Sequence, residues 1–187
     1  MRQVAVVVLA AGQGTRMKSD VHKVLHPVAG RPMLLHLLAA LQAAGATLTV
    51  VVVGARREQV EEALASSGAQ VVVQHEQRGT AHAALCAKDA LANFDGLVMI
   101  CFGDAPLLRS DTIARLCDRI EQVDTPAVVV LGFRPADPAA YGRIFADGDR
   151  ISKMVEYKDA SAAERALGLC NSGVTVMRAA DAWPLLE

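Results

Sequence analysis

Two glycines that are separated by one residue stand in the run Leu9-Ala10-Ala11-Gly12-Gln13-Gly14-Thr15-Arg16-Met17, directly after an apolar segment. Glycines at this spacing let the backbone turn sharply and expose successive N–H groups, which can bind phosphate oxygens. Arg16 could add a bidentate contact to the same phosphate. The run is not a dinucleotide fingerprint, because Met17 takes the place of the third glycine, and no Gly-Lys-Ser/Thr follows to make a Walker A loop. By itself the pattern also fits an ordinary turn between a strand and a helix.

Two charged residues could complete a site for phosphate and metal. Lys23 lies in a segment with few helix signals, and a lysine in a long loop beside a phosphate-binding turn suits an anion, although composition alone favours a solvated surface lysine. Asp104 follows the apolar segment Leu97–Phe102 and offers the hard oxygen ligand that Mg²⁺ prefers. The alternative is an aspartate that satisfies the turn before Pro106. We favour the metal role, because parallel strands bring the loops at their carboxyl ends to one edge of a sheet.

The segment Gln74–His82 combines polar groups with a turn and the start of a helix. Gln74 carries both a donor and an acceptor, which matches the imide edge of uracil. Gly79 permits close approach of the backbone, and Thr80 could be the N-cap of the following helix, a role that is compatible with base binding. The two histidines of this segment fit exposed or packed side chains better than metal ligands.

Polar residues in the last third of the chain could bind a sugar. Glu156 and Asn171 could form hydrogen bonds with sugar hydroxyls or an amide, and Tyr141-Gly142-Arg143-Ile144 forms a third polar segment. Their spacing alone does not establish a site, and each of them taken singly also fits an ordinary surface position.

The composition bounds the class of partner. The chain of 187 residues has 19 basic and 20 acidic residues, so its net charge of −1 gives no reason to expect nucleic acid or an anionic membrane as a partner. The four cysteines lack metal-ligand spacing, which predicts free thiols in a reducing compartment. The apolar run Val4–Ala11 is too short for a signal peptide, and no apolar stretch approaches the ~20 residues of a membrane span. We therefore expect a soluble, cytoplasmic protein.

Apolar segments alternate with amphipathic ones through the first two thirds of the chain. Continuous β-branched runs that alternate with helices predict a parallel sheet with helices on both faces, which is a Rossmann-like α/β fold. The predicted strands are Val4–Leu9, Leu48–Val53, Val71–Val73, Leu97–Phe102 and Ala127–Leu131. The predicted helices are Arg31–Ala44, Glu58–Ser66, Thr80–Leu91 and one that Ser110 caps.

The pattern changes after Gly132. Arg143–Phe145 and Ile151–Val155 flank the turn residues Asp147-Gly148-Asp149, which predicts a hairpin, and Asn171–Met177 is a further predicted strand. We therefore expect a mixed, mostly parallel sheet in one domain over residues 1–187, with a nucleotide-binding half over 1–131 and the start of a sugar-binding half over 132–187. The chain stops in what resembles the start of a helix, which suggests a truncated domain.

These segments, taken together and in order, resemble one family over essentially the whole chain. They are LAAGQGTRM, KVLHPVAGRPM, QHEQRGTAHA, FGDAPL, YGRI, VEYKDA and NSG, and they are similar to the uridyltransferase domain of bacterial N-acetylglucosamine-1-phosphate uridyltransferase. No single segment is specific, but the joint pattern is. The resemblance implies a nucleotidyltransferase fold with Mg²⁺ as the cofactor and with UTP and a sugar-1-phosphate as substrates.

The resemblance also implies roles for particular residues. The implied catalytic residues are Arg16, Lys23 and Asp104, and Asp104 would hold the metal ion. The implied nucleotide-binding residues are Leu9, Ala10, Ala11, Gly12, Gly14, Arg16, Lys23, Gln74, Gly79, Thr80, Phe102 and Gly103. The implied sugar-binding residues are Gly142, Glu156 and Asn171.

The sequence departs from the family pattern at three points. His22 stands before Lys23 where the family usually has proline, and Phe102 stands where tyrosine is common. The second metal-binding asparagine of the family lies beyond Glu187. The family also carries a C-terminal β-helix with acetyltransferase activity, so the contacts on which its trimers rely would lie outside this chain, and self-association stays open.

The reaction that the resemblance implies needs positioning more than proton transfer. A sugar-1-phosphate is an anion at neutral pH, so its oxygen can attack the α-phosphorus of UTP without a general base, and pyrophosphate leaves. Two alternatives remain open at this point. One is a different nucleotidyltransferase, such as a molybdopterin guanylyltransferase or an enzyme for another sugar-1-phosphate, and the other is a non-catalytic nucleotide-binding module.

Overall fold

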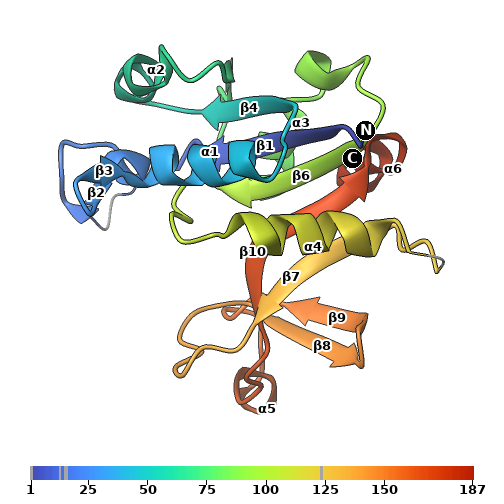
Figure 1. Cartoon of the computed structure of the whole chain (residues 1–187). Helices are drawn as coiled ribbons and strands as arrows, with labels where there is room; N and C mark the ends of the chain where they lie inside the picture. Colours follow the sequence, from blue (N-terminus) through green and yellow to red (C-terminus); the bar gives the residue numbers. More distant parts are fainter. Residues whose placement is uncertain (1, 13, 15–16, 123) are drawn as a thin grey trace. The chain divides into compact units, whose positions relative to one another are not determined.

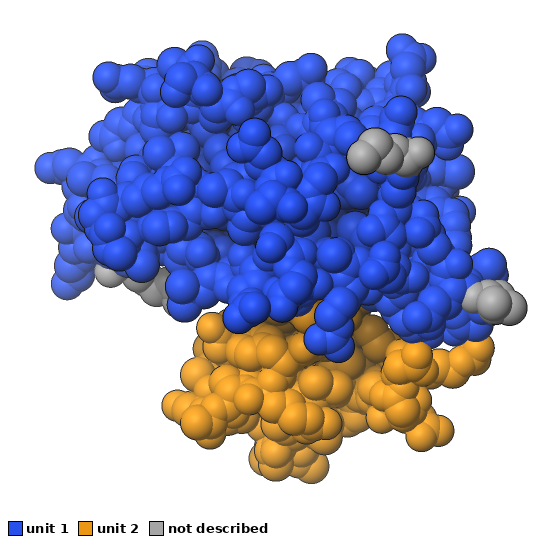
Figure 2. All heavy atoms as spheres, in the orientation of Figure 1, with its two compact units in different colours: residues 1–129, 175–187 blue, residues 130–174 orange. Residues whose placement is uncertain are grey.

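The computed structural model describes residues 2–12, 14, 17–122 and 124–187. The chain divides into two units, which Figure 2 distinguishes by colour. Unit 1 contains Met1–Val129 and Thr175–Glu187, and unit 2 contains Val130–Val174. The last part of the chain therefore returns to the unit in which it began.

A mostly parallel sheet forms the centre of unit 1. Its strands lie in the order β5-β4-β1-β6-β10, with β4, β5 and β6 in parallel register and β10 antiparallel to β6. All seven residues of β1 are buried, as expected for a strand that is covered on both faces. The mixed, mostly parallel sheet predicted from the sequence is thereby confirmed. The strands are β1 (Val4–Ala10), β4 (Leu48–Val53), β5 (Gln70–Val73), β6 (Leu97–Phe102) and β10 (Cys170–Arg178).

Helices cover both faces of this sheet (Figure 1). On one face α1 contacts α4, and on the other α3 contacts α6. The second pair is alanine-rich where it meets Ala5, Val7 and Leu9 of β1, so its helices can approach the strands closely. The first pair buries larger leucine and isoleucine side chains. The helices are α1 (Met33–Ala43), α2 (Glu58–Leu64), α3 (Thr80–Leu85), α4 (Ser110–Ile120) and α6 (Ala179–Leu186).

Several predicted helix ends are wrong by one or more residues. Helix α1 begins at Met33, because its N-cap Pro32 still belongs to the strand β3 (Arg31–Pro32), which pairs antiparallel with β2 (Pro27–Val28). Neither predicted cap residue is a cap. Ser110 and Thr80 are the first residues of α4 and α3, and the extended Arg109 and the left-handed Gly79 are the caps. The predicted helix to Leu91 ends at Leu85, where the bonding tightens to i→i+3 and a short 3₁₀ helix, η3 (Asp89–Leu91), follows.

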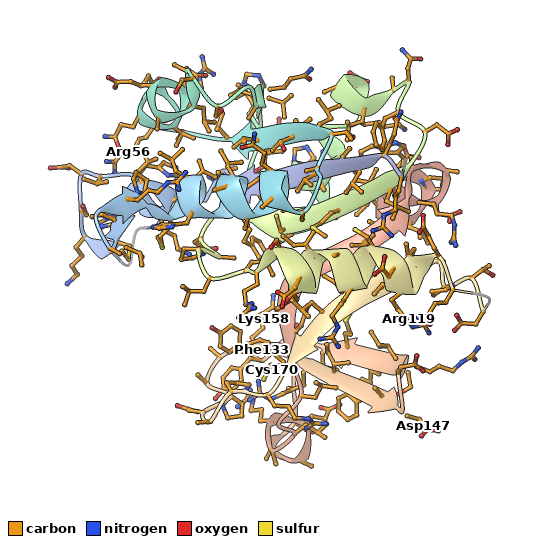
Figure 3. All side chains as sticks on the ribbon, in the orientation of Figure 1. Arg56, Arg119, Phe133, Asp147, Lys158 and Cys170 are labelled. Atoms are coloured by element: carbon orange, nitrogen blue, oxygen red, sulfur yellow. The ribbon has the colours of Figure 1, made fainter. Side chains whose placement is uncertain are left out.

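Unit 2 is built on the predicted hairpin. Strands β8 (Arg143–Asp147) and β9 (Arg150–Val155) pair antiparallel, and Asp147, labelled in Figure 3, lies at the turn. Gly148 has φ of +58° there, a conformation that favours glycine. The capping box of α5 (Ala162–Arg165), the strand β7 (Val128–Phe133) and the first part of β10 complete the elements around this hairpin.

Arg143 organises the loops of unit 2. Its side chain is 2% exposed, and its guanidinium donates to the carbonyl oxygens of Pro138, Ala139, Tyr141 and Arg165. It also lies 5.7 Å from the ring centroid of Tyr157. A buried charge is tolerated only when its donors are satisfied, and here backbone carbonyls satisfy them. Arg143 therefore fixes the backbone that leads into Gly142.

Two expectations about composition can be compared with the structure. The four cysteines, all within the described residues, are free thiols, and burial raises the pKa of Cys101 to about 12. In the described part of the chain, no helix combines the length and apolar character that a membrane crossing requires.

His22 is a buried polar residue in the loop between β1 and α1. Its side chain is 2% exposed, and within the described residues neither ring nitrogen has a hydrogen-bond partner. Burial of the imidazole, and secondarily the charge of Arg56, hold the pKa of His22 below its ordinary value of 6.5. The folded chain therefore disfavours protonation of this imidazole more than the unfolded chain does.

We predict that the substitution His22→Phe reduces the loss of stability at acid pH. As the pH falls below 6.5, the unfolded chain takes up a proton on this imidazole before the folded chain does. The contribution of His22 to the free energy of unfolding is therefore complete above pH 6.5 and is lost progressively as the pH falls below 6.5. Urea unfolding midpoints of both proteins at several pH values between about 5 and 7.5 measure this effect. Other titrating groups are common to both proteins, so two parallel pH profiles would contradict the prediction.

Candidate nucleotide site

The carboxyl ends of β1 and β6 lie side by side in unit 1. Leu9 is the register partner of Phe102, and the N–H of Gly103 donates to the carbonyl of Leu9 at 2.9 Å. On its other side β1 pairs with β4, so the strand order reverses direction at β1, the position where open α/β sheets bind ligands. The structure thus brings the glycine-rich run and the segment of Asp104 to one edge of the sheet, as the sequence predicted.

The glycine-rich run turns back on itself after β1. Ala10 and Ala11 are buried, Gly12 is exposed, and Gly14 has φ of +60°, with the N–H of Met17 donating to its carbonyl at 2.8 Å. Gly14 also fits closely against Lys23, because a Cβ at position 14 would lie 2.7 Å from the Cβ of Lys23. Arg16, the predicted second phosphate ligand, lies outside the described residues.

Lys23 and Asp104 form an ion pair. The Lys23 ammonium contacts the Asp104 carboxylate, and the two side chains are 35% and 30% exposed, so both remain accessible from solvent. Lys23 begins the short 3₁₀ helix η2 (Lys23–Leu25), whose Val24 is buried. Val24 lies against Gly103, where a Cβ would meet its Cγ1 at 3.2 Å. Three predicted residues, Gly14, Lys23 and Asp104, therefore lie together, although Asp104 is far from the other two in the sequence.

The residues predicted to bind the base lie after β5. Gln74 is 5% exposed, and its amide nitrogen lies 3.3 Å from the carbonyl of Gly79 and 3.0 Å from Nδ1 of His82. The predicted free donor of Gln74 is therefore engaged within the chain, where it fixes the turn at Gly79. Gly79 and Thr80 are exposed at the start of α3.

Residues without a predicted role also hold this edge of the sheet. Gln77 donates to the carbonyl of Ala11 at 3.0 Å and so links the segment after β5 to the end of β1. Arg56, labelled in Figure 3, and Gln59 both donate to the carbonyl of Asp20, shortly before Lys23. Exposed polar residues in a helix and a turn give no signal in the sequence that they bind another loop.

The three predicted sugar-binding residues lie together in unit 2. The N–H of Asn171 donates to the carbonyl of Gly142 at 2.9 Å, and a Cβ at position 142 would lie 3.5 Å from both carboxylate oxygens of Glu156. The Asn171 side chain accepts from the N–H of Gly173 at 2.8 Å, which fixes its amide oxygen. The backbone and side chains therefore present a carboxylate and an amide around one glycine.

The donor set at Asp104 can be compared with the needs of a metal ion. Among the described residues, no group of three or more His, Cys, Asp and Glu side chains could hold a metal. Asp104 supplies a carboxylate, and it already contacts a cation, the Lys23 ammonium. Mg²⁺ is commonly bound by one or two carboxylates together with substrate phosphates. The residues present fit a Mg²⁺ ion whose other ligands come from a nucleotide and water.

The sequence is similar to several curated bacterial proteins. It is 56% identical over 186 residues to "Bifunctional protein GlmU" of Rhizorhabdus wittichii, and the match covers 99% of this chain and 41% of that protein. It is 55% identical over 183 residues to the protein of the same name from Sphingopyxis alaskensis, with 98% and 40% covered. The chain thus spans about two fifths of the length of these relatives. These matches agree with the resemblance that the motifs indicate.

A solved structure has the same fold. It is UDP-glucose pyrophosphorylase complexed with UDP-glucose, which has a TM-score of 0.76 at 19% identity and covers 100% of this chain and 79% of that one. A likeness at this identity establishes the fold alone, and it confirms the predicted Rossmann-like nucleotidyltransferase fold.

A family model also matches most of the chain. The model of the MobA-like NTP transferase domain matches residues 6–168, a span that contains the glycine-rich run, Lys23 and Asp104. Because this span covers most of the 187 residues, the chain belongs to the MobA-like NTP transferase family.

Proposed function

We propose that this chain transfers a uridylyl group from UTP to N-acetylglucosamine-1-phosphate and releases pyrophosphate. The observation that carries the proposal is the ion pair of Lys23 and Asp104 beside the turn at Gly14, at the edge where β1 and β6 end. The motifs that resemble the uridyltransferase family and the relatives named GlmU support this substrate pair over other nucleotides and sugars. Nucleotidyltransferases of this family generally use a divalent metal ion, and we propose Mg²⁺.

In this proposal the protein acts by positioning and by charge. The backbone N–H groups after β1 and the Lys23 ammonium bind the triphosphate and reduce its repulsion of the incoming sugar phosphate. Arg16 would add a guanidinium to the same phosphates. Asp104 would hold Mg²⁺, which supplies further neutralisation of phosphate charge when it is bound. No residue has to act as a base, because the sugar phosphate is already ionised.

The remaining predicted residues divide between base and sugar. Gln74 and Gly79, held together by a hydrogen bond, would present their segment to the uracil with Thr80. Leu9 and Phe102 would line the nucleotide at the ends of their strands. We assign the nucleotide to residues 1–131 and the sugar to residues 132–187, where Gly142, Glu156 and Asn171 gather.

We predict that the chain releases pyrophosphate with UTP and N-acetylglucosamine-1-phosphate, in the presence of Mg²⁺, at least about tenfold faster than with GTP. A coupled pyrophosphate assay with the full chain measures both rates, and glucose-1-phosphate in place of the amino sugar tests the sugar. Preference for GTP would favour a guanylyltransferase. Binding of UDP-N-acetylglucosamine by calorimetry without any turnover would instead favour a non-catalytic binding module.

We predict that Gly14→Ala lowers kcat/KM for UTP by about tenfold or more, which corresponds to about 1.4 kcal/mol. A methyl group at position 14 would collide with Lys23, which contacts Asp104. The matched control is Gly148→Ala, whose φ of +58° is close to the +60° of Gly14 but whose new methyl group would meet nothing within 4 Å. Steady-state kinetics of both variants compare them, and equal losses would attribute the effect to backbone strain alone.

We predict that Gly142→Ala raises KM for the sugar-1-phosphate about three- to tenfold and leaves KM for UTP unchanged. The added methyl group would lie 3.3 Å from the carbonyl oxygen of Val155, which is a tight contact, and 3.5 Å from the Glu156 carboxylate oxygens, so it would fill the space beside that carboxylate. Gly168→Ala is the control, because its methyl group would make only an ordinary contact of 3.7 Å with Arg134. A rise in both KM values would show that position 142 does not act on the sugar alone.

A further inference from the structure

The segment before Lys23 has little structure of its own. Residues 18–22 belong to no helix or strand, and Lys18 has φ of +48°, a backbone conformation that residues other than glycine rarely adopt. On its other side Lys23 is fixed by η2, because Val24 is buried against Gly103. Apart from a local bond of the Val21 N–H to Oγ of Ser19, the contacts that hold this segment before Lys23 come from elsewhere in the chain.

Gln59 of α2 supplies two of these contacts. Its amide nitrogen donates to the carbonyl of Asp20 at 2.9 Å, and its amide oxygen accepts from the N–H of His22 at 2.7 Å. One side chain thus binds the backbone on both sides of Val21. Both hydrogen bonds involve groups that an irregular segment would otherwise leave to water.

Arg56 adds a third contact from the turn before α2. Its guanidinium donates to the carbonyl of Asp20, the same oxygen that Gln59 binds. Arg56 itself has φ of +63°, so the chain accepts a rare backbone conformation at the residue that reaches this oxygen. Two side chains from one short region therefore converge on the residue three positions before Lys23.

We propose that Gln59 is a positioning residue for Lys23, with Arg56 as its support. The bonds of Gln59 to Asp20 and His22 hold the entry to η2, and η2 directs the Lys23 ammonium to Asp104 and to the phosphates. This inference rests on the proposed function of Lys23. It extends that function to a residue that touches neither substrate nor metal.

The first test is kinetic. Gln59→Leu removes both hydrogen bonds and is expected to raise KM for UTP about three- to tenfold, with KM for the sugar-1-phosphate and the thermal midpoint little changed. Gln59→Glu keeps the acceptor for His22 but sets a carboxylate oxygen against the carbonyl oxygen of Asp20, so it should also raise KM for UTP. The control is Glu62→Leu, which changes another exposed residue of α2. Equal changes in both KM values, or a KM for UTP unchanged in Gln59→Leu, would overturn the proposal.

The second test replaces the hydrogen bond with a covalent restraint. His22 has φ of −58°, which lies in the range that a proline ring imposes, but proline has no N–H to donate to Gln59. In a His22→Pro background, Gln59→Leu should therefore cost at most about half of its usual factor in KM. In a His22→Phe background, which keeps the N–H, the full cost should remain. The same cost in all three backgrounds would show that the bond to His22 does not position Lys23.

A third measurement separates this inference from the proposed reaction. Hydrogen exchange of the His22 amide, followed by NMR on the full chain, should accelerate about tenfold or more in Gln59→Leu, while the amides of β1 keep their protection. If the wild-type chain does not turn over UTP, the proposed function fails, and the exchange data still decide whether Gln59 holds the segment. Unchanged exchange at His22 would overturn the positioning role even in an active enzyme.

Discussion

The contact between the Lys23 ammonium and the Asp104 carboxylate is the interaction on which the candidate site depends. Each side chain is about one third exposed, and ion pairs of this kind contribute only about 0–1 kcal/mol to stability. The pair therefore does not hold the fold together. The fold instead places the pair, through the parallel register of β1 and β6 and through the packing of Val24 on Gly103.

The same pair joins the residue that would bind the phosphates, Lys23, to the residue that would hold the metal ion, Asp104. A triphosphate offers Lys23 more negative charge than a single carboxylate does, so we expect the ammonium to turn to the nucleotide when the nucleotide binds. Asp104 would then be available to a metal ion that the phosphates also ligate. Lysine suits this exchange of partners, because its ammonium is a point charge on a flexible stem and is not bound to one planar geometry.

The parts of this structure that follow a local pattern could be predicted from the sequence. The β-branched runs identify β1, β4 and β6, and the rule that parallel strands share one edge brings Gly14 and Asp104 together. Helix ends were less accurate, because Thr80 and Ser110 have the residue types of caps while the backbone at Gly79 and Arg109 decides where each helix begins. Type alone does not determine the φ and ψ of the preceding residue.

Contacts between segments that are distant in the chain have no local pattern in the sequence from which they could be predicted. From the sequence alone, Gln59 and Arg56 are polar residues that would be expected on the surface. Only the packing of α2 beside η2 reveals that they bind the backbone before Lys23. The return of Thr175–Glu187 to unit 1 depends in the same way on pairing of β10 with β6. Arg178 secures this return with bonds to the carbonyls of Ile120 and Pro126, at 2.6 and 3.0 Å.

Three buried polar residues lie beside the candidate binding residues, at positions where burial of a polar group costs stability. Within the described residues they are His22, Gln74 and Arg143, and each stands next to residues with a proposed role in binding. Hydrogen bonds to backbone carbonyls offset the burial of Gln74 and Arg143. The same bonds fix the turn at Gly79 and the loop before Gly142. The His22 backbone is bonded, through its N–H to Gln59 and through its carbonyl to the N–H of Leu25, but its ring nitrogens have no partner among the described residues. A local departure from the usual rule that buried polar groups are satisfied, in a loop that leads into Lys23, is the kind of conflict that marks a functional segment.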